Sequence, residues 1–184
     1  MIASGDWFNP TRATGLAAYG AALVCCTIAW VRTRMRTRMR TKGRLALWLM
    51  GIEGVLLLDI VFNWRWMLHG LVGGYAQSHH EYEQRRLPQV IALVILAGLL
   101  LIGLIAVLRM FRKRVWALLA VSGALLSLVT WCVEVVSLHA VDHVLYHTVG
   151  SVMAVSLLWI LACVMTSVGV LVDARQAKPR RSAK

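Results

Sequence analysis

The chain of 184 residues is 59% hydrophobic, with a mean hydropathy of +0.69, whereas about half of the residues in a soluble domain are apolar. This composition predicts an integral membrane protein whose main partner is the lipid bilayer. The net charge of +12 would indicate a nucleic-acid partner in a soluble chain. Here the basic residues form short blocks between apolar runs, where membrane orientation explains them, so we expect no nucleic-acid partner.

Five apolar runs approach or exceed the roughly 20 residues that a helix needs to cross the hydrocarbon core. In chain order they cover residues 14–31, 45–66, 87–108, 115–138 and 144–172. A single helix over residues 115–172 would be about 87 Å long, so the chain must reverse near the polar residues 137–142. The sequence thus predicts an all-α, polytopic bundle of about five transmembrane helices. It forms one domain over residues 1–172, followed by a basic, disordered tail over residues 173–184.

Positive charge between the runs sets the expected orientation. Residues 32–44, 109–114 and 173–184 contain 16 of the 20 Lys and Arg residues, and cytoplasmic loops are enriched in these residues. We therefore expect the N-terminus to be extracytoplasmic and the C-terminus cytoplasmic. A short bundle with basic loops suits a multi-pass protein of the bacterial plasma (inner) membrane. The block at 32–44 is also dense enough to attract anionic lipid head groups.

Acidic residues inside the runs indicate a polar interior. Glu53 and Asp59 would lie about 12 Å and 21 Å from the start of the second run, which is hydrocarbon depth. Ionisable residues at this depth usually face a bundle interior or a wet cavity, so partners on other helices are expected. The residues predicted to form a buried polar group or a proton path are Glu53, Asp59, Asn63 and Glu134.

Histidines gather on the expected extracytoplasmic side of the bundle. Imidazole binds transition metals and haem iron and also shuttles protons. If the fifth helix begins near Asp142, which could cap it, then His143 and His147 share one helical face. The candidate ligands for haem b or a transition metal are His69, His139, Asp142, His143 and His147. Alternatively, these histidines pair with nearby acids at a wet interface.

Enzyme signatures fit the chain poorly, so whether it is an enzyme stays open. His80 and Glu81 are not followed by the second histidine of HExxH, and no GxSxG motif is present. Four cysteines show no CxxC spacing and are expected to pack as small hydrophobes. They are Cys25, Cys26, Cys132 and Cys163.

Three functions are consistent with these patterns. In the first, the histidine cluster binds haem b or a transition metal for electron transfer or metal handling, with Glu53 and Asp59 as a proton path. In the second, the chain is a non-catalytic accessory or assembly subunit whose polar residues pair with other subunits of a larger membrane complex. In the third, it is an enzyme or binder acting on an anionic lipid head group held by Arg85 and Arg86, although such a pair also commonly flanks a span.

Overall fold

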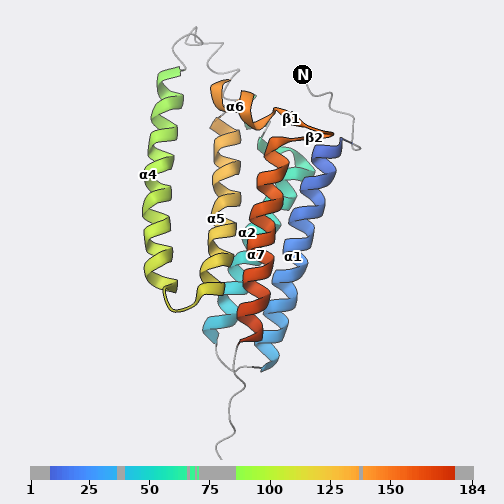
Figure 1. Cartoon of the computed structure of the whole chain (residues 1–184), viewed down its shortest axis with the longest axis vertical. Coiled ribbons are helices and arrows are strands. Elements are labelled where there is room, and N and C mark those ends of the chain that lie inside the picture. Colours follow the sequence, from blue (N-terminus) through green and yellow to red (C-terminus); the bar gives the residue numbers. More distant parts are fainter. Residues whose placement is uncertain are drawn as a thin grey trace, which may run out of the picture.

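The structure is a computed structural model that describes residues 9–36, 40–65, 67, 68, 70, 86–136 and 139–176. Within these residues, five helices are long and apolar enough to cross a membrane (Figure 1). They are α1 (Pro10–Arg36), α2 (Arg40–Phe62), α4 (Arg86–Phe111), α5 (Val115–Val136) and α7 (Ala154–Arg175). The predicted all-α membrane bundle of five spans is therefore confirmed.

Four of the five helices form a compact core, and α4 lies outside it. Within the core, α5 packs against α7, α7 against α1, and α1 against α2. The backbones of α5 and α7 touch at two glycines: a Cβ on Gly169 would lie 2.4 Å from the Ala120 nitrogen, and one on Gly123 would lie 2.6 Å from the Ala162 carbonyl oxygen. Small residues permit such close helix packing in membranes. The α5–α7 pair is thus the tightest contact in the bundle.

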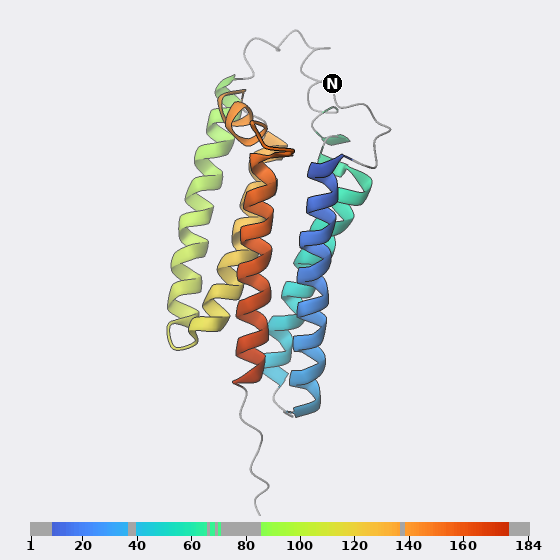
Figure 2. The ribbon, with the colours of Figure 1, turned by 45° about the vertical axis from the view of Figure 1, so that its right-hand side comes forward.

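Helix α4 stands at the edge of the bundle in both views, next to α5 (Figures 1 and 2). No side chain between Val90 and Met110 is buried. A helix that is apolar on all sides and has few protein neighbours is typical of a span surrounded by lipid. We therefore regard α4 as the most lipid-exposed helix of the bundle.

The two ends of the bundle are named here after the arginine at each. At the Arg65 end, α1 and α7 begin and α2 and α5 end; at the Arg114 end these directions are reversed. Two buried clusters fill the interior in turn. The Tyr19 core lies toward the Arg65 end and comprises Tyr19, Ala22, Leu56, Ile60, Leu145, Val155, Trp159 and Cys163. The Ala29 core lies toward the Arg114 end and comprises Cys26, Ala29, Ala46, Leu49, Ala120, Ala124, Val170 and Ala174.

The fifth span begins at Ala154, later than the predicted start near residue 144. Before it come the short helix α6 (His139–Leu145) and two paired strands, β1 (Thr148–Val149) and β2 (Val152–Met153). Gly150, with φ of +67°, makes the turn, and the flanking Thr and Val residues favour strands. The amide of Ala154 closes the hairpin with a 2.9 Å bond to the His147 carbonyl. This hairpin replaces the first turns of the predicted helix.

Two expectations about this segment are consequently wrong. His143 lies in α6 and His147 lies after its end, so the two histidines do not share a face of the fifth helix. Asp142 lies within α6, and the residue preceding α7 is Met153, so Asp142 does not cap the fifth span.

Candidate functional site

Arg65 binds two carboxylates in the interior near one end of the bundle. Its Nη2 atom lies 2.6 Å from Asp59 Oδ2, and its Nη1 atom lies 2.5 Å from Glu134 Oε2. The Nε–H group also donates to Asp59 Oδ2, at 2.6 Å. The Arg65 side chain is only 5% exposed and both carboxylates are 2% exposed. We call these three residues the Arg65 cluster.

A break in the helix at the end of α2 places Arg65 in this position. Asn63 adopts a left-handed conformation with φ of 61°, and its amide donates to the Asp59 carbonyl at 2.6 Å. Asparagine is, after glycine, a common residue for ending a helix in this way. The Arg65 amide then donates to Asp59 Oδ1 at 2.9 Å. Asn63 itself is exposed, so it ends the helix and does not join the buried polar group in which we expected it.

The charges of the Arg65 cluster do not cancel. Burial disfavours the charged guanidinium, but Glu134 and Asp59 together outweigh that effect, so the pKa of Arg65 lies above its ordinary value. The guanidinium carbon also lies 5.1 Å from the centre of the Trp159 ring, within range of a cation–π interaction. One cation faces two carboxylates, which leaves one negative charge in excess when all three groups are ionised.

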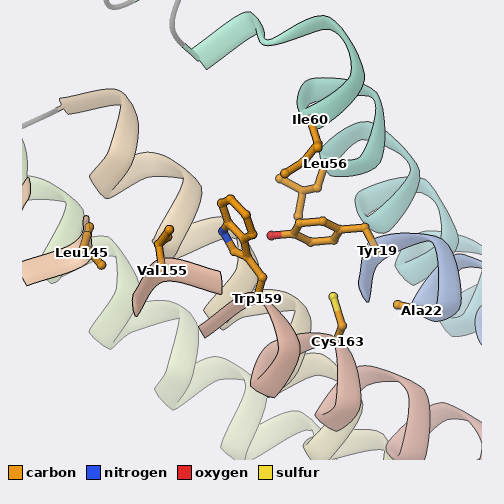
Figure 3. Packing of buried hydrophobic residues seen from close by; sticks show 8 residues of the cluster. All are labelled: Tyr19, Ala22, Leu56, Ile60, Leu145, Val155, Trp159 and Cys163. Carbon is orange, nitrogen blue, oxygen red and sulfur yellow. The ribbon is translucent and has the colours of Figure 1, made fainter. Parts of the chain in front are cut away.

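Beneath the Arg65 cluster, α1 and α7 bring together polar and aromatic side chains of the Tyr19 core. The Tyr19 and Trp159 rings are 6.3 Å apart between centres. Figure 3 shows the Tyr19 hydroxyl pointing toward the Trp159 indole, with the Cys163 thiol pointing into the same region. Trp159 also lies under the Arg65 guanidinium, and Cys163, one helical turn further along α7, donates to Glu53. These side chains therefore lie between the Arg65 cluster and a third acid.

That third acid, Glu53, is fully buried near the middle of the Gly43–Phe62 span. The Cys163 thiol donates to its Oε2 atom at a distance of 3.8 Å. Among the described residues, no basic side chain forms an ion pair with Glu53. An unpaired carboxylate in an apolar interior is costly, which favours the neutral acid at this position.

Further polar atoms point into the same half of the bundle from α5 and α7. Ser127 interacts with Cys163, and Trp159 interacts with Glu134. Two others, Trp131 Nε1 and Ser156 Oγ, are buried and have no hydrogen-bond partner within the part of the chain that the structure describes. Buried polar groups of this kind are usually satisfied by ordered water. The interior between the Arg65 cluster and Glu53 is thus built for hydrogen bonding, although it lies inside a membrane bundle.

The candidate metal ligands are less favourably placed. His143 and His147 are exposed, and the described residues contain no group of three or more His, Cys, Asp or Glu side chains that could hold a metal ion. The other predicted ligands and anion holders lie, wholly or in their side chains, outside the described residues: His69, His139, Asp142, Arg85 and Arg86. A site for haem b or a metal, and an anion site at Arg85 and Arg86, therefore stay predictions.

Sequence reasoning did not select Arg65, Tyr19 or Cys163 as site residues. One signal was available for Arg65: it is a lone cation at the end of a run that carries two acids. Tyr19 and Cys163 lie in apolar runs and are indistinguishable there from packing residues. Their role depends on which helix faces they occupy, and the sequence does not show this.

Comparisons with protein-family models, curated proteins and solved structures found no match for this chain. Its function is therefore inferred from the geometry of the buried polar residues.

Proposed function

We propose that this membrane protein takes up protons from the extracytoplasmic side and delivers them to Glu53 in the middle of the bundle. One observation carries this inference: Glu53 is a fully buried acid that has no cation partner among the described residues, and it lies beyond a charged cluster close to one membrane surface. Carboxyl groups inside membrane bundles commonly serve as proton relays. The orientation follows from the basic segments, which gather at the Arg114 end and favour the cytoplasm.

Protons would enter at the Arg65 cluster. The single excess negative charge of Asp59 and Glu134 attracts one proton, because an uncompensated charge in an apolar interior is costly. Arg65 holds both carboxylates at hydrogen-bond distance and so keeps the accepting oxygens in fixed positions. The cluster thus combines an affinity for one proton with a rigid geometry.

The Tyr19 core would provide the route from the cluster to Glu53. A phenol and a thiol can each accept one proton while releasing another. The Cys163 thiol already donates to Glu53, so a proton arriving at Sγ lets the resident thiol proton pass to a deprotonated Glu53. The unpartnered hydroxyl and indole groups of α5 and α7 would hold the water that completes the route.

The route would end at Glu53. The Ala29 core on its other side contains one thiol, that of Cys26, and its other seven residues are alanine, leucine and valine, which carry no group that could accept or release a proton. Two buried hydroxyls, those of Thr166 and Thr33, lie nearer the Arg114 end, and both bond to carbonyls of their own helices. We therefore propose reversible loading of Glu53 from one side of the membrane, without conduction across it.

A hydrophobic carbodiimide tests this function, because it crosses membranes and reacts with protonated carboxyl groups. Right-side-out and inside-out vesicles containing the full-length protein are treated in media of different pH, and modified residues are located by mass spectrometry. We expect Glu53 to be modified, less so when the medium of right-side-out vesicles is made alkaline. An alkaline medium around inside-out vesicles should have no such effect.

Two variants serve as controls. Glu53→Gln should lose this modification, and Cys163→Ala should retain it but respond more slowly to a change of pH. Modification that follows the pH at the Arg114 side, or at both sides equally, would contradict one-sided uptake. Failure of the reagent to modify Glu53 at any pH would contradict the protonated acid itself.

A further inference from the structure

Helix α4 exposes apolar side chains over most of its circumference, while a half-buried stripe that includes Leu96, Leu100 and Val107 marks the remaining face. Consecutive residues such as Leu101 and Ile102 are both exposed, although they point about 100° apart on a helix. The same is true of Val94 and Ile95. Hydrocarbon chains can therefore lie along most of the α4 circumference.

At the Arg114 end, this apolar surface stops at a group of cations. Arg109, Arg112 and Lys113 are all exposed and follow one another within about one helical turn and the turn to α5. The nearby acid Asp173 is engaged by Arg114, through Nη2 at 2.5 Å and Nε at 3.3 Å. No other ion pair in the described residues reaches this turn. The three cations thus keep their positive charge available.

The α4–α5 turn holds these cations in place. The Arg114 amide donates to the Phe111 carbonyl at 2.7 Å, and the Arg114 guanidinium carbon lies 5.9 Å from the centre of the Phe111 ring. Because Arg114 is also bound to α7 through Asp173, the turn is attached to the four-helix core. Fixed cations lose less freedom on binding an anion than mobile ones do.

We infer that three cations at the C-terminal end of α4, namely Arg109, Arg112 and Lys113, bind an anionic phospholipid. Its head-group phosphate would contact the three cations, and its acyl chains would lie along α4. The ligand must have a long apolar part and an anionic end, because the surface of α4 is apolar along the helix and cationic at its C-terminal end. A zwitterionic lipid carries its own cation beside the phosphate and so complements three positive charges less well.

Native mass spectrometry of the full-length protein in detergent tests this site, with phosphatidylglycerol or phosphatidylcholine added. The test variant is Arg109→Gln/Arg112→Gln/Lys113→Gln. A matched control, Arg34→Gln/Arg44→Gln/Arg175→Gln, removes three exposed cations at the same end from three other helices. Circular dichroism checks that both variants keep the helical content of the wild type.

We expect the wild type to retain phosphatidylglycerol in preference to phosphatidylcholine. The test variant should bind phosphatidylglycerol on the order of a hundredfold more weakly, whereas the control should stay close to the wild type. Glycerol phosphate, which lacks acyl chains, should not displace the lipid at the same concentration.

Four results would each overturn the inference. These are equal retention of the two lipids by the wild type, equal weakening by the test and control variants, unchanged binding by the test variant, and displacement by glycerol phosphate. The site lies at the opposite end from the Arg65 cluster, so this test gives the same answer whether or not Glu53 is loaded with protons.

Discussion

The same four helices build a polar interior at one end of the bundle and an apolar interior at the other. On α2 the buried positions change from Asp59 and Glu53 to Leu49 and Ala46 toward the Arg114 end. On α7 the buried positions change from polar and aromatic residues (Ser156, Trp159, Cys163 and Thr166) to small ones (Gly169, Val170 and Ala174). The exception is Asp173 at the Arg114 end of the helix, which Arg114 binds. If the interior were polar along its whole length, protons could cross the membrane. If it were apolar along its whole length, it would contain no acid to protonate. The asymmetry therefore suits a site that is loaded from one side.

The largest effect is expected from Arg65→Ala. It leaves Asp59 and Glu134 buried without a cation, and breaking a buried ion pair in this way costs about 3–5 kcal/mol. The free energy of unfolding in mixed micelles would measure the loss. The triple variant Arg65→Met/Asp59→Leu/Glu134→Leu should recover most of the lost stability, because no charge is then left unpaired. If the triple variant is no more stable than Arg65→Ala, the unpaired charges are not the cause.

The apolar half should be most sensitive to the α5–α7 contact. In Gly169→Ala the new methyl would lie 2.4 Å from the backbone of α5, and overpacking of this kind costs about 1–3 kcal/mol. Gly51→Ala is the matched control, since a Cβ there has no neighbour within 4 Å and alanine is the better helix former. Under identical conditions, the free energy of unfolding should therefore fall in Gly169→Ala and rise in Gly51→Ala, each relative to the wild type. Equal stability would show that the helices separate easily at this point.

A single hydroxyl in the apolar half should weaken the barrier to protons. Val170→Thr nearly keeps the volume of a buried side chain, and burying one hydroxyl without a fixed partner costs about 1–3 kcal/mol. A hydroxyl without a fixed partner can also bind water, which would extend the route beyond Glu53. In proteoliposomes containing a pH-sensitive dye, this variant should leak protons faster than the wild type. Adding Glu53→Gln should remove the leak. A leak that persists without Glu53 would point to general loosening of the bundle.

Arg114→Ala should have the smallest effect. Its side chain is 32% exposed and that of Asp173 is 12% exposed, and water-accessible ion pairs contribute up to about 1 kcal/mol. Salt should reduce the difference between variant and wild type, whereas it should hardly alter the effect of Arg65→Ala. Comparing the two variants at low and high ionic strength separates the exposed pair from the buried cluster. If Arg114→Ala lowers the free energy of unfolding as much as Arg65→Ala does, the exposed pair and the buried cluster do not differ in their contribution to stability.

Five apolar runs were enough to predict the helical membrane bundle, because length and hydropathy decide which segments can cross a bilayer. The start of the fifth span was missed because Thr148 to Met153 is apolar enough to continue a helix, yet Gly150 allows a tight hairpin. The pairing of Arg65 with Glu134 spans 69 residues and depends on how α2 and α5 pack. Tyr19 and Cys163 gain their positions between the acids in the same way. Sequence alone does not determine which of two helix faces meets a neighbour.

The helix break at Asn63 also has a consequence for the biogenesis of the protein. Arg65 follows Asp59 by six residues and meets it through two side-chain contacts and its own amide, all within one segment of the nascent chain. The counter-ion of Asp59 is therefore available as soon as the end of α2 has been synthesised, before α5 and Glu134 exist. The second span can therefore enter the bilayer with Asp59 paired to a cation. Glu134 then binds the same arginine after α5 has been synthesised. The same arginine thus serves as the counter-ion of the second span and as the centre of the completed site.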